Sequence, residues 1–238
     1  MKLSVVIPVY NEEKRIKKTS EILDSYLKTA VEDYEIIFSN DGSIDSTPQL
    51  LGEIGSNNPK IKVVGYEKNK GKGSAVRTGV LASDGDYVIF TDCDLAYGTE
   101  VIKRALGVFE ENGCDVVIGS RNLDSESYEG YTFTRKVMSK VYFKIISIVS
   151  GFKLSDSQCG FKGFSKKAAH DVFSECSIDS FAFDLEALIK AQGKGYKICE
   201  MSVKIIDNDN SESKVKMIRD AFKMLLDIRK IKQNNKKN

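Results

Sequence analysis

Short apolar runs recur along the chain, separated by stretches in which apolar residues have a helical spacing. The run at residues 3–9 is almost continuously apolar, which is typical of a strand buried on both faces. Similar runs follow at residues 34–39, 61–66, 86–90 and 115–119. The stretches between them predict helices that end near residues 29, 54, 81 and 111, with Asn11 capping the first and Asp45 or Ser46 the second. This alternation predicts an α/β fold, a mostly parallel Rossmann-like sheet with helices on both faces.

The composition excludes several classes of function. The chain has 238 residues and a net charge of +2, so its charge provides no general attraction to nucleic acid. His170 is the single histidine, which excludes zinc sites and triads that need several; we expect it on an exposed helix face. The five cysteines are widely spaced and lack a CxxC pair. They predict free thiols in a reducing, cytoplasmic compartment rather than a disulfide framework.

Membrane-crossing segments are not expected. The apolar run at the N-terminus is too short for a signal peptide, and about 18 consecutive apolar residues occur nowhere. We therefore predict neither a signal peptide nor a transmembrane helix.

Chemically distinctive residues follow the predicted strands directly. The carboxyl ends of parallel strands share one edge of a sheet, and α/β sheets bind ligands there. Asp92 and Asp94 follow the fourth strand, where extended backbone would point both carboxylates the same way. They predict a shared Mg²⁺ or Mn²⁺ ion that also holds substrate phosphates. A D-x-D tripeptide alone is more often a solvated loop, so its neighbours at the other strand ends decide: Pro8, Tyr10, Asn11, Glu12, Asp41 and Gly71–Lys72–Gly73.

Two common nucleotide-binding motifs are missing from these strand ends. The first strand is not followed by G-x-G-x-x-G, which argues against a dinucleotide site, and the chain has no Walker loop. Gly71 and Gly73 suit a tight turn before a helix, and they equally suit close approach of the backbone to a ligand. Both interpretations remain open at this point.

Five motifs share their order and spacing with a known family. They are residues 5–13 (VVIPVYNEE), 40–43 (NDGS), 69–79 (NKGKGSAVRTG), 91–94 (TDCD) and 119–121 (GSR). Together they resemble the inverting family 2 glycosyltransferases of GT-A fold. Residues 156–162 (DSQCGFK), 181–186 (FAFDLE) and Ser213-Lys214 look like the dolichyl-phosphate β-glucosyltransferase branch, to which dolichol-phosphate mannose synthases are related. The chain departs from that branch in lacking its common transmembrane segments and a proline within residues 95–98.

The resemblance implies a division of the chain. Residues 1–212 would form the GT-A domain, with a nucleotide-binding half to about residue 121 and an acceptor half from 122 to 212. A basic amphipathic helix and tail, residues 213–238, would follow.

The resemblance also implies roles for individual residues. Asp94 would ligate the metal, which neutralises charge on the leaving nucleoside diphosphate. The other residues implied at the nucleotide are Pro8, Tyr10 and Glu12 at the base, Asp41 at the uracil imide, Lys72 and Gly73 near base and ribose, and Asp92. Arg121, Arg135 and Lys214 would lie near phosphates, and Gln158 is assigned to substrate binding.

The acceptor decides what the second half must supply. A hydroxyl acceptor needs a general base, for which Asp184 and Glu186 are the candidates. A lipid phosphate is already anionic and needs cations to orient it instead, such as Arg121 or Lys162. For Lys162 an ordinary surface position is an equally good interpretation.

Two basic, apolar-rich stretches at residues 135–149 and 213–232 are typical of helices that lie on a membrane surface, although each could simply pack on the domain. The leading hypothesis is a metal-dependent, inverting transfer of glucose from UDP-glucose to a polyprenyl (dolichyl-type) phosphate at the cytoplasmic face of a membrane. The alternatives are transfer of mannose from GDP-mannose, transfer to a hydroxyl of a cell-surface polysaccharide, and a nucleotide-binding protein without turnover.

Overall fold

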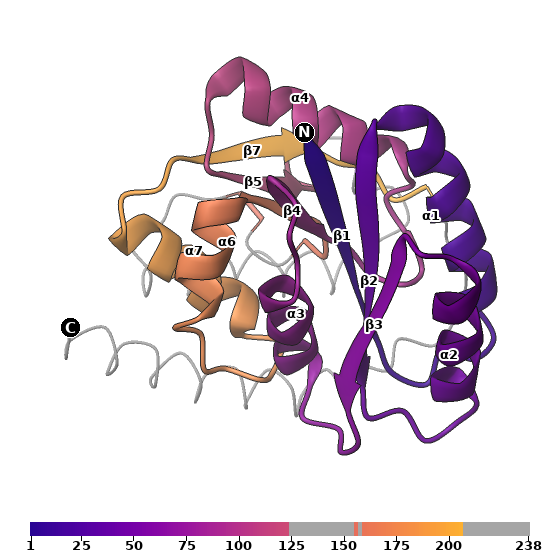
Figure 1. Ribbon diagram of the computed structural model, residues 1–238. Helices are drawn as coiled ribbons and strands as arrows, with labels where there is room; N and C mark the ends of the chain where they lie inside the picture. Colours follow the sequence, from indigo (N-terminus) through magenta and orange to yellow (C-terminus); the bar gives the residue numbers. More distant parts are fainter. Residues whose placement is uncertain (124–154, 157–158, 207–238) are drawn as a thin grey trace, which may run out of the picture.

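A single mixed sheet runs through the part of the chain that the structure describes. The computed structural model describes residues 1–123, 155–156 and 159–206 (Figure 1). Within these ranges seven strands form the sheet in the order β3-β2-β1-β4-β6-β5-β7. The strands are β1 (Lys2–Val9), β2 (Asp33–Asp41), β3 (Ile61–Tyr66), β4 (Tyr87–Phe90), β5 (Val116–Ser120), β6 (Lys162–Ser165) and β7 (Ile198–Ser202).

The five strands expected from the apolar runs are all present, and β1 to β4 pair in parallel. Strand β6 is the exception, because it runs antiparallel to both of its neighbours, β4 and β5. It consists of only four residues, KGFS, so it has too few apolar positions to be recognised as a strand. Strand β6 places residues from late in the chain between two strands of the first half.

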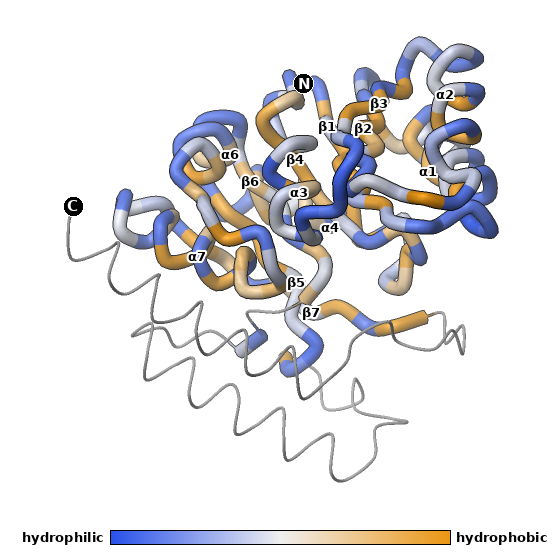
Figure 2. Tube along the Cα trace, turned by 90° about the horizontal axis from the view of Figure 1, so that it is seen from below, coloured by the Kyte–Doolittle hydropathy of each residue, from blue (hydrophilic) through white to orange (hydrophobic). Residues whose placement is uncertain are grey.

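Helices cover both faces of the sheet, as the alternation predicted. They are α1 (Ile16–Ala30), α2 (Thr47–Asn57), α3 (Lys72–Leu81), α4 (Glu100–Asn112), α6 (Lys166–Phe173) and α7 (Phe183–Gly193). Figure 1 shows α1 and α2 on one side, with α3, α6 and α7 on the other. Two apolar cores result: one joins α1 and α4 to the sheet, and the other joins α3, α6 and α7 to it. Figure 2 shows apolar residues mainly in the strands, while the outer turns of α1 and α2 are largely hydrophilic.

The predicted cap of the first helix is wrong. Helix α1 begins at Ile16, and Arg15 is the preceding cap residue. Asn11 has a φ of +54° and lies in the turn before the helix. Its Oδ1 accepts a hydrogen bond from the backbone N–H of Ile44 (2.9 Å), so it fastens a neighbouring loop instead. A small polar residue after a strand suits a left-handed turn as well as a cap, and the tertiary contact decides between them.

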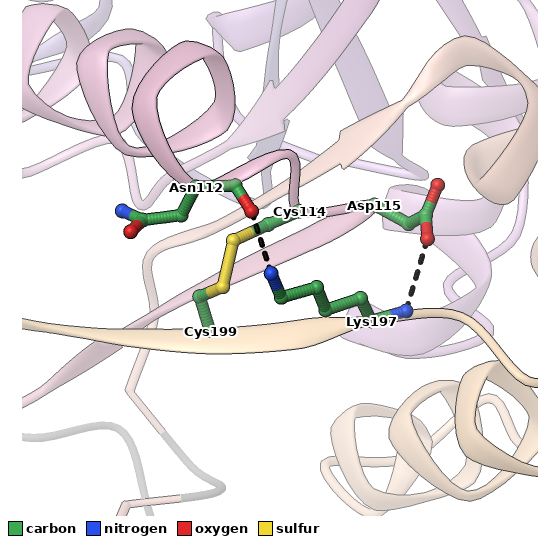
Figure 3. Close-up of a disulfide and its surroundings, with 5 residues drawn as sticks. All are labelled: Asn112, Cys114, Asp115, Lys197 and Cys199. Carbon is green, nitrogen blue, oxygen red and sulfur yellow. Dashed lines mark hydrogen bonds between the residues drawn. A yellow bond between two sulfur atoms is a disulfide. The ribbon is translucent and has the colours of Figure 1, made fainter.

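Two expectations from the composition are also corrected. Cys114 and Cys199 form a disulfide between the segment that leads into β5 and strand β7 (Figure 3), so the five cysteines are not all free thiols. The other three cysteines are free and buried. His170 is half-buried rather than exposed, and its Nε2 lies 3.3 Å from the carbonyl oxygen of Ser83. Wide spacing in sequence concealed the disulfide because β5 and β7 are neighbours only in the folded sheet.

In the part of the chain that the structure describes, no helix has the length and apolarity needed to cross a bilayer. The predicted surface helices at residues 135–149 and 213–232 lie outside the described residues.

Candidate active site

The segment after β4 is a turn, not the extended backbone assumed for the D-x-D pair. The backbone N–H of Leu95 donates to the carbonyl oxygen of Asp92 (3.1 Å), and Leu95 has a φ of +49°. Asp94 Oδ1 accepts a hydrogen bond from the N–H of Ala96 (3.1 Å) within the same turn. The two carboxylates therefore have different surroundings, although both remain at the carboxyl edge of the sheet.

Asp92 is held by an ion pair. Its Oδ1 lies 2.5 Å from Lys72 Nζ at the first residue of α3, and the two side chains are 36% and 22% exposed respectively. A Cβ on Gly160 would lie 2.3 Å from Asp92 Oδ2, so only glycine fits there without displacing the carboxylate. Burial opposes the charge of Lys72, yet Asp92 and Asp184 outweigh it and raise the pKa of this lysine. Lys72 thus stays cationic beside the predicted diphosphate position.

Asp94 suits a metal ion. Asp94 is exposed as a residue, but partial desolvation of its carboxylate and the negative charge of Asp92 raise its pKa above the ordinary value. A divalent cation would relieve this repulsion, and carboxylate oxygens are the ligands that Mg²⁺ and Mn²⁺ prefer. The described residues contain no group of three or more His, Cys, Asp or Glu side chains arranged for a metal. This set of ligands fits an ion completed by substrate phosphates rather than one enclosed by protein.

Asp41, at the end of β2, is engaged by the last residue of β3 and by the loop that follows this strand. It is buried and accepts hydrogen bonds from Tyr66 Oη (2.7 Å), Asn69 Nδ2 (2.9 Å) and the N–H groups of Lys70 (2.9 Å) and Gly71 (3.0 Å). Burial and the hydrogen bond to Asp41 also raise the pKa of Tyr66. The carboxylate therefore orders residues 69–71 at the base of the site. Its contact with the nucleobase, which the resemblance implied, stays a prediction.

The turn after β1 is joined to the loop before α2. The N–H groups of Asn11 and Glu12 donate to Ser43 Oγ (2.9 Å) and Thr47 Oγ1 (2.8 Å). Tyr10 beside them is exposed, while Pro8 is half-buried within β1. These contacts hold the residues predicted to surround a base next to the end of β2.

Gly71 and Gly73 permit close approach of the backbone, but to the protein itself. Gly71 has a φ of +122°, and a Cβ there would lie 2.4 Å from the carbonyl oxygen of Asp179. The N–H of Gly73 donates to the same oxygen (2.9 Å), and a Cβ on Gly73 would lie 2.5 Å from the carbonyl oxygen of Ile178. Neither earlier interpretation included this contact. The glycines let the start of α3 pack on the segment that leads into α7.

Asp184 forms a buried ion pair with Lys162. Lys162 Nζ lies 2.8 Å from Asp184 Oδ1, and the side chains are 0% and 9% exposed. The same ammonium donates to the carbonyl oxygen of Cys159 (2.7 Å) and lies over the ring of Phe90. Desolvation raises the pKa of Asp184, while Lys162 and Lys72 act in the opposite direction. The sequence suggested that Lys162 is either a surface cation or a ligand for a phosphate. Neither interpretation fits a side chain that is fully buried.

Glu186 is occupied by hydrogen bonds of the backbone. Its two oxygens accept from the N–H groups of Ser177 (3.0 Å) and Ile178 (2.8 Å), and Ser177 Oγ donates as well (3.1 Å). The side chain is buried. Glu186 therefore anchors the segment before α7, and Asp184 is the stronger of the two candidates for a base.

Arg121, just after β5, is paired with Asp156. Its Nε and Nη2 donate to the two carboxylate oxygens at 2.6 and 3.0 Å, a bidentate arrangement that fixes the plane of the guanidinium. Burial opposes the charge of Arg121, but Asp156 outweighs it and raises the arginine pKa. Asp156 is fully buried, whereas the Arg121 side chain is 25% exposed. The positive group is therefore held at the surface by a carboxylate beneath it.

A pocket of about 770 Å³ opens beside Asp94, between α1, the 93–99 segment, the start of α4 and residues 202–206. Its volume is within the range of small-molecule sites. Among the described residues four cations line it, against the two carboxylates of Asp94 and Glu100: Arg15, Lys18, Arg104 and Lys204. The positive excess and the adjoining carboxylate suit a ligand that carries phosphate.

Three predicted site residues, Arg135, Gln158 and Lys214, lie outside the described residues. The prediction in turn missed Asp156 and Gly160 as individual site residues. Both belong to the 156–162 motif, which was recognised as a signature without separate roles for its members. Their partners, Arg121 and Asp92, come from other motifs, so only the fold brings them together.

The fold is that of one class of enzyme, the glycosyltransferases, as comparison with solved structures shows. The glucosyl-3-phosphoglycerate synthase of Mycobacterium tuberculosis, solved with Mn²⁺, UDP and glucosyl-3-phosphoglycerate, superimposes with a TM-score of 0.66 at 17% identity, covering 97% of this chain and 77% of that one. The mannosyl-3-phosphoglycerate synthase of Rubrobacter xylanophilus gives a TM-score of 0.65 at 18% identity, covering 99% and 75%. At such identities the likeness concerns the fold, which is the GT-A fold of glycosyltransferases.

Sequence similarity then identifies the family. The model of glycosyl transferase family 2 matches residues 4–173. The dolichyl-phosphate β-glucosyltransferase of Dictyostelium discoideum is 32% identical over 254 residues, which cover 97% of this chain and 77% of that protein. The human protein of the same name is also 32% identical, over 88% of this chain and 69% of its own length. The chain belongs to glycosyltransferase family 2 and is an enzyme of that family, as its motifs predicted.

Proposed function

We propose that the protein transfers glucose from UDP-glucose to a polyprenyl phosphate of the dolichyl type, with inversion at the anomeric carbon. The similarity to dolichyl-phosphate β-glucosyltransferases over nearly the whole chain supports this choice of donor sugar and acceptor. The observation that carries the proposal is that the two candidate bases, Asp184 and Glu186, are both buried and already engaged by protein partners.

Neither carboxylate is well placed to deprotonate an alcohol. Glu186 is occupied by backbone donors, and Asp184 is buried against the ammonium of Lys162. A hydroxyl acceptor would need an accessible base within hydrogen-bond reach of its proton. A phosphate monoester is already ionised at neutral pH, so it needs no base and needs only cations to hold it. The arrangement therefore favours a phosphate oxygen as the nucleophile.

The reaction is an in-line displacement. A phosphate oxygen of the acceptor forms a bond to the anomeric carbon, the bond from that carbon to the diphosphate oxygen breaks, and UDP leaves with the electron pair. Lys72 and Arg121 present positive charge at the site, each fixed by a carboxylate. Such preorganised charges stabilise the leaving diphosphate without reorganisation during the reaction.

Asp94, with Asp92 beside it, would hold the divalent ion. When bound, the ion neutralises charge on the diphosphate and so makes it a better leaving group. UDP is bound together with Mn²⁺ or Mg²⁺ in solved proteins of the same fold. We propose that either ion serves here.

The acceptor implies work at a membrane surface. A polyprenyl chain is embedded in lipid, so its phosphate lies at headgroup level. The basic stretches at residues 135–149 and 213–232 remain our proposed contact with that surface, on the cytoplasmic face. The Cys114–Cys199 disulfide is atypical of a reducing compartment, and cell fractionation tests the proposed cytoplasmic location.

Incubation with radiolabelled UDP-glucose, Mg²⁺ and dolichyl phosphate tests the proposal. We expect labelled lipid, competition by UDP rather than GDP, and loss of metal-dependent UDP binding in Asp94→Ala by calorimetry. Competition by GDP instead would favour the mannosyl alternative. Failure to label lipid in the presence of membranes, with a hydroxyl acceptor labelled instead, would overturn the choice of acceptor.

The role of Asp184 separates the two acceptor classes. Asp184→Asn should abolish transfer to a hydroxyl but only weaken transfer to a phosphate, because the phosphate needs no base. Activity per folded molecule, determined beside a urea titration, is the quantity to compare, since this variant also leaves Lys162 without its partner carboxylate.

A further inference from the structure

Glu200 on strand β7 is connected to Arg121 through intervening residues. Glu200 Oε1 accepts hydrogen bonds from both the N–H (2.8 Å) and the Oγ (2.6 Å) of Ser155. Ser155 Oγ also lies 2.5 Å from the Oγ of Ser120, the residue that precedes Arg121. Glu200 therefore accepts two hydrogen bonds from Ser155. Ser155 directly precedes Asp156, the residue that binds Arg121.

The next residue, Asp156, completes the chain of contacts. It is fully buried, and its oxygens accept from Nε and Nη2 of Arg121, while Oδ2 also accepts from the Arg121 backbone N–H (3.2 Å). Asn122 Nδ2 donates a short hydrogen bond to the carbonyl oxygen of Ser155. The 155–156 dipeptide is thus fastened to the end of β5 on one side and to Glu200 on the other.

The strand that carries Glu200 is itself firmly attached. Strands β5 and β7 pair in parallel, with Ile118 opposite Glu200. Cys199, the residue before Glu200, is bonded to Cys114, and Lys197 makes hydrogen bonds to Asp115 Oδ2 (2.9 Å) and the Asn112 carbonyl oxygen (2.6 Å) (Figure 3). Residues 112–115 and 197–199 therefore form a rigid base for the Glu200 side chain.

We propose that Glu200 is a positioning residue for Arg121, acting through Ser155 and Asp156. The inference rests on the proposed function only where it assigns Arg121 to the donor phosphates. The geometric half concerns the position of the guanidinium and is independent of what the enzyme transfers. Partners that orient a ligating group from behind commonly affect binding by about tenfold or more.

Arginine-selective labelling with phenylglyoxal, followed by peptide mass spectrometry, tests the geometric half. Glu200→Ala should raise the labelling rate of Arg121 severalfold, because the carboxylate that shields its guanidinium is no longer held. Glu200→Gln retains the acceptor oxygen and should restore slow labelling. Glu53→Ala is the matched control, since it also removes a glutamate carboxylate, one on α2 whose contacts are with Lys17 and Gln49.

Arg77 provides an internal control in every sample. Arg77 lies on α3, and its side chain is 24% exposed, similar to that of Arg121. Its Nη2 is paired with Oδ1 of Asp179 at 2.7 Å. If Glu200→Ala merely loosened the whole domain, Arg77 and Arg121 would be labelled faster together, and that result would overturn the proposal. An unchanged Arg121 rate would also overturn it.

Calorimetry of UDP with Mn²⁺ tests the functional half on the same proteins. We expect Glu200→Ala to weaken UDP binding about tenfold, with Glu200→Gln and Glu53→Ala close to the unmodified enzyme. Faster Arg121 labelling with unchanged UDP affinity would overturn the link to the donor. If the unmodified enzyme failed to bind UDP, the proposed function would be refuted, and the labelling would still decide the position of Arg121.

Discussion

Two regions of the sheet are stabilised in different ways. The first region, residues 2–90, contains the parallel strands β1 to β4, whose buried side chains are mainly apolar. Its buried carboxylate, Asp41, is satisfied by neutral donors. The second region, residues 114–206, also has a buried carboxylate held by neutral donors, Glu186. Two others in this region are held by cations, Asp184 by Lys162 and Asp156 by Arg121.

The difference shows where stability and function overlap. Apolar burial is non-directional and tolerates many sequences, so it suits a scaffold. A buried ion pair needs both partners in place, because either charge left alone is strongly unfavourable. The second region therefore depends on a few specific residues, and these are the residues next to the proposed site of sugar transfer.

Removing the ammonium beneath Asp184 should have the largest effect. Lys162→Met leaves the carboxylate of Asp184 buried without its ion-pair partner, and we expect a loss of about 3–5 kcal/mol in the free energy of unfolding, measured by urea titration. A double change, Lys162→Met with Asp184→Leu, should recover most of it. Lys166→Met is the control, since Lys166 is the exposed partner of Asp84 and its loss should matter little. A loss below about 1 kcal/mol in Lys162→Met would contradict the comparison.

The same variant should depend on pH in a defined direction. Burial already raises the pKa of Asp184, and without Lys162 the folded-state pKa moves further above the unfolded value. The folded state then binds a proton more tightly than the unfolded state, so stability falls as pH rises from about 4 through the raised pKa. The deficit of Lys162→Met relative to the unmodified protein should shrink on acidification. A deficit that grew instead would indicate a different cause.

Loss of the disulfide should come next. Cys114 and Cys199 are 85 residues apart, and a disulfide typically contributes about 2–4 kcal/mol to stability. Cys114→Ser with Cys199→Ser should lower stability by that amount, and a reducing agent should do the same to the unmodified protein. Thiol titration in denaturant checks the premise. Three reactive thiols before reduction and five afterwards are expected, and five before reduction would disprove the bond.

Changing Glu186 should have an intermediate effect. Glu186→Gln keeps the shape of the side chain but replaces one acceptor oxygen with an NH2 group, which faces the N–H groups of Ser177 and Ile178. We expect the free energy of unfolding to fall by about 1–3 kcal/mol. Transfer to a phosphate acceptor, corrected for the folded fraction, should change little. Loss of transfer in fully folded Glu186→Gln would identify this carboxylate as catalytic after all.

The smallest effect is expected for an ion pair of the first region. Lys28 and Asp24 are one turn apart on α1, and Lys28 is largely exposed. Lys28→Ala should cost no more than about 0.5 kcal/mol, and the difference should disappear at high salt. A cost comparable to that of Lys162→Met would remove the contrast between the two regions.

The first region was predictable because its information is local. Continuous apolar runs predicted β1 to β4, and the strand-end motifs predicted which edge carries Asp41, Asp92 and Asp94. Strand β6 escaped notice because its four residues carry little apolar pattern, and it inserts antiparallel between strands from earlier in the chain.

By itself the sequence determined the α/β class, the glycosyltransferase family, and the residue types at the carboxyl edge of the sheet. Only the tertiary structure decided the partners of those residues. It turned Gly71 and Gly73 into a contact with residues 178–179, buried Lys162 beneath Asp184, and joined Cys114 to Cys199. The physical reason is that strand and helix patterns arise from neighbours in sequence, whereas ion pairs, disulfides and backbone contacts join residues that become neighbours only when the sheet assembles.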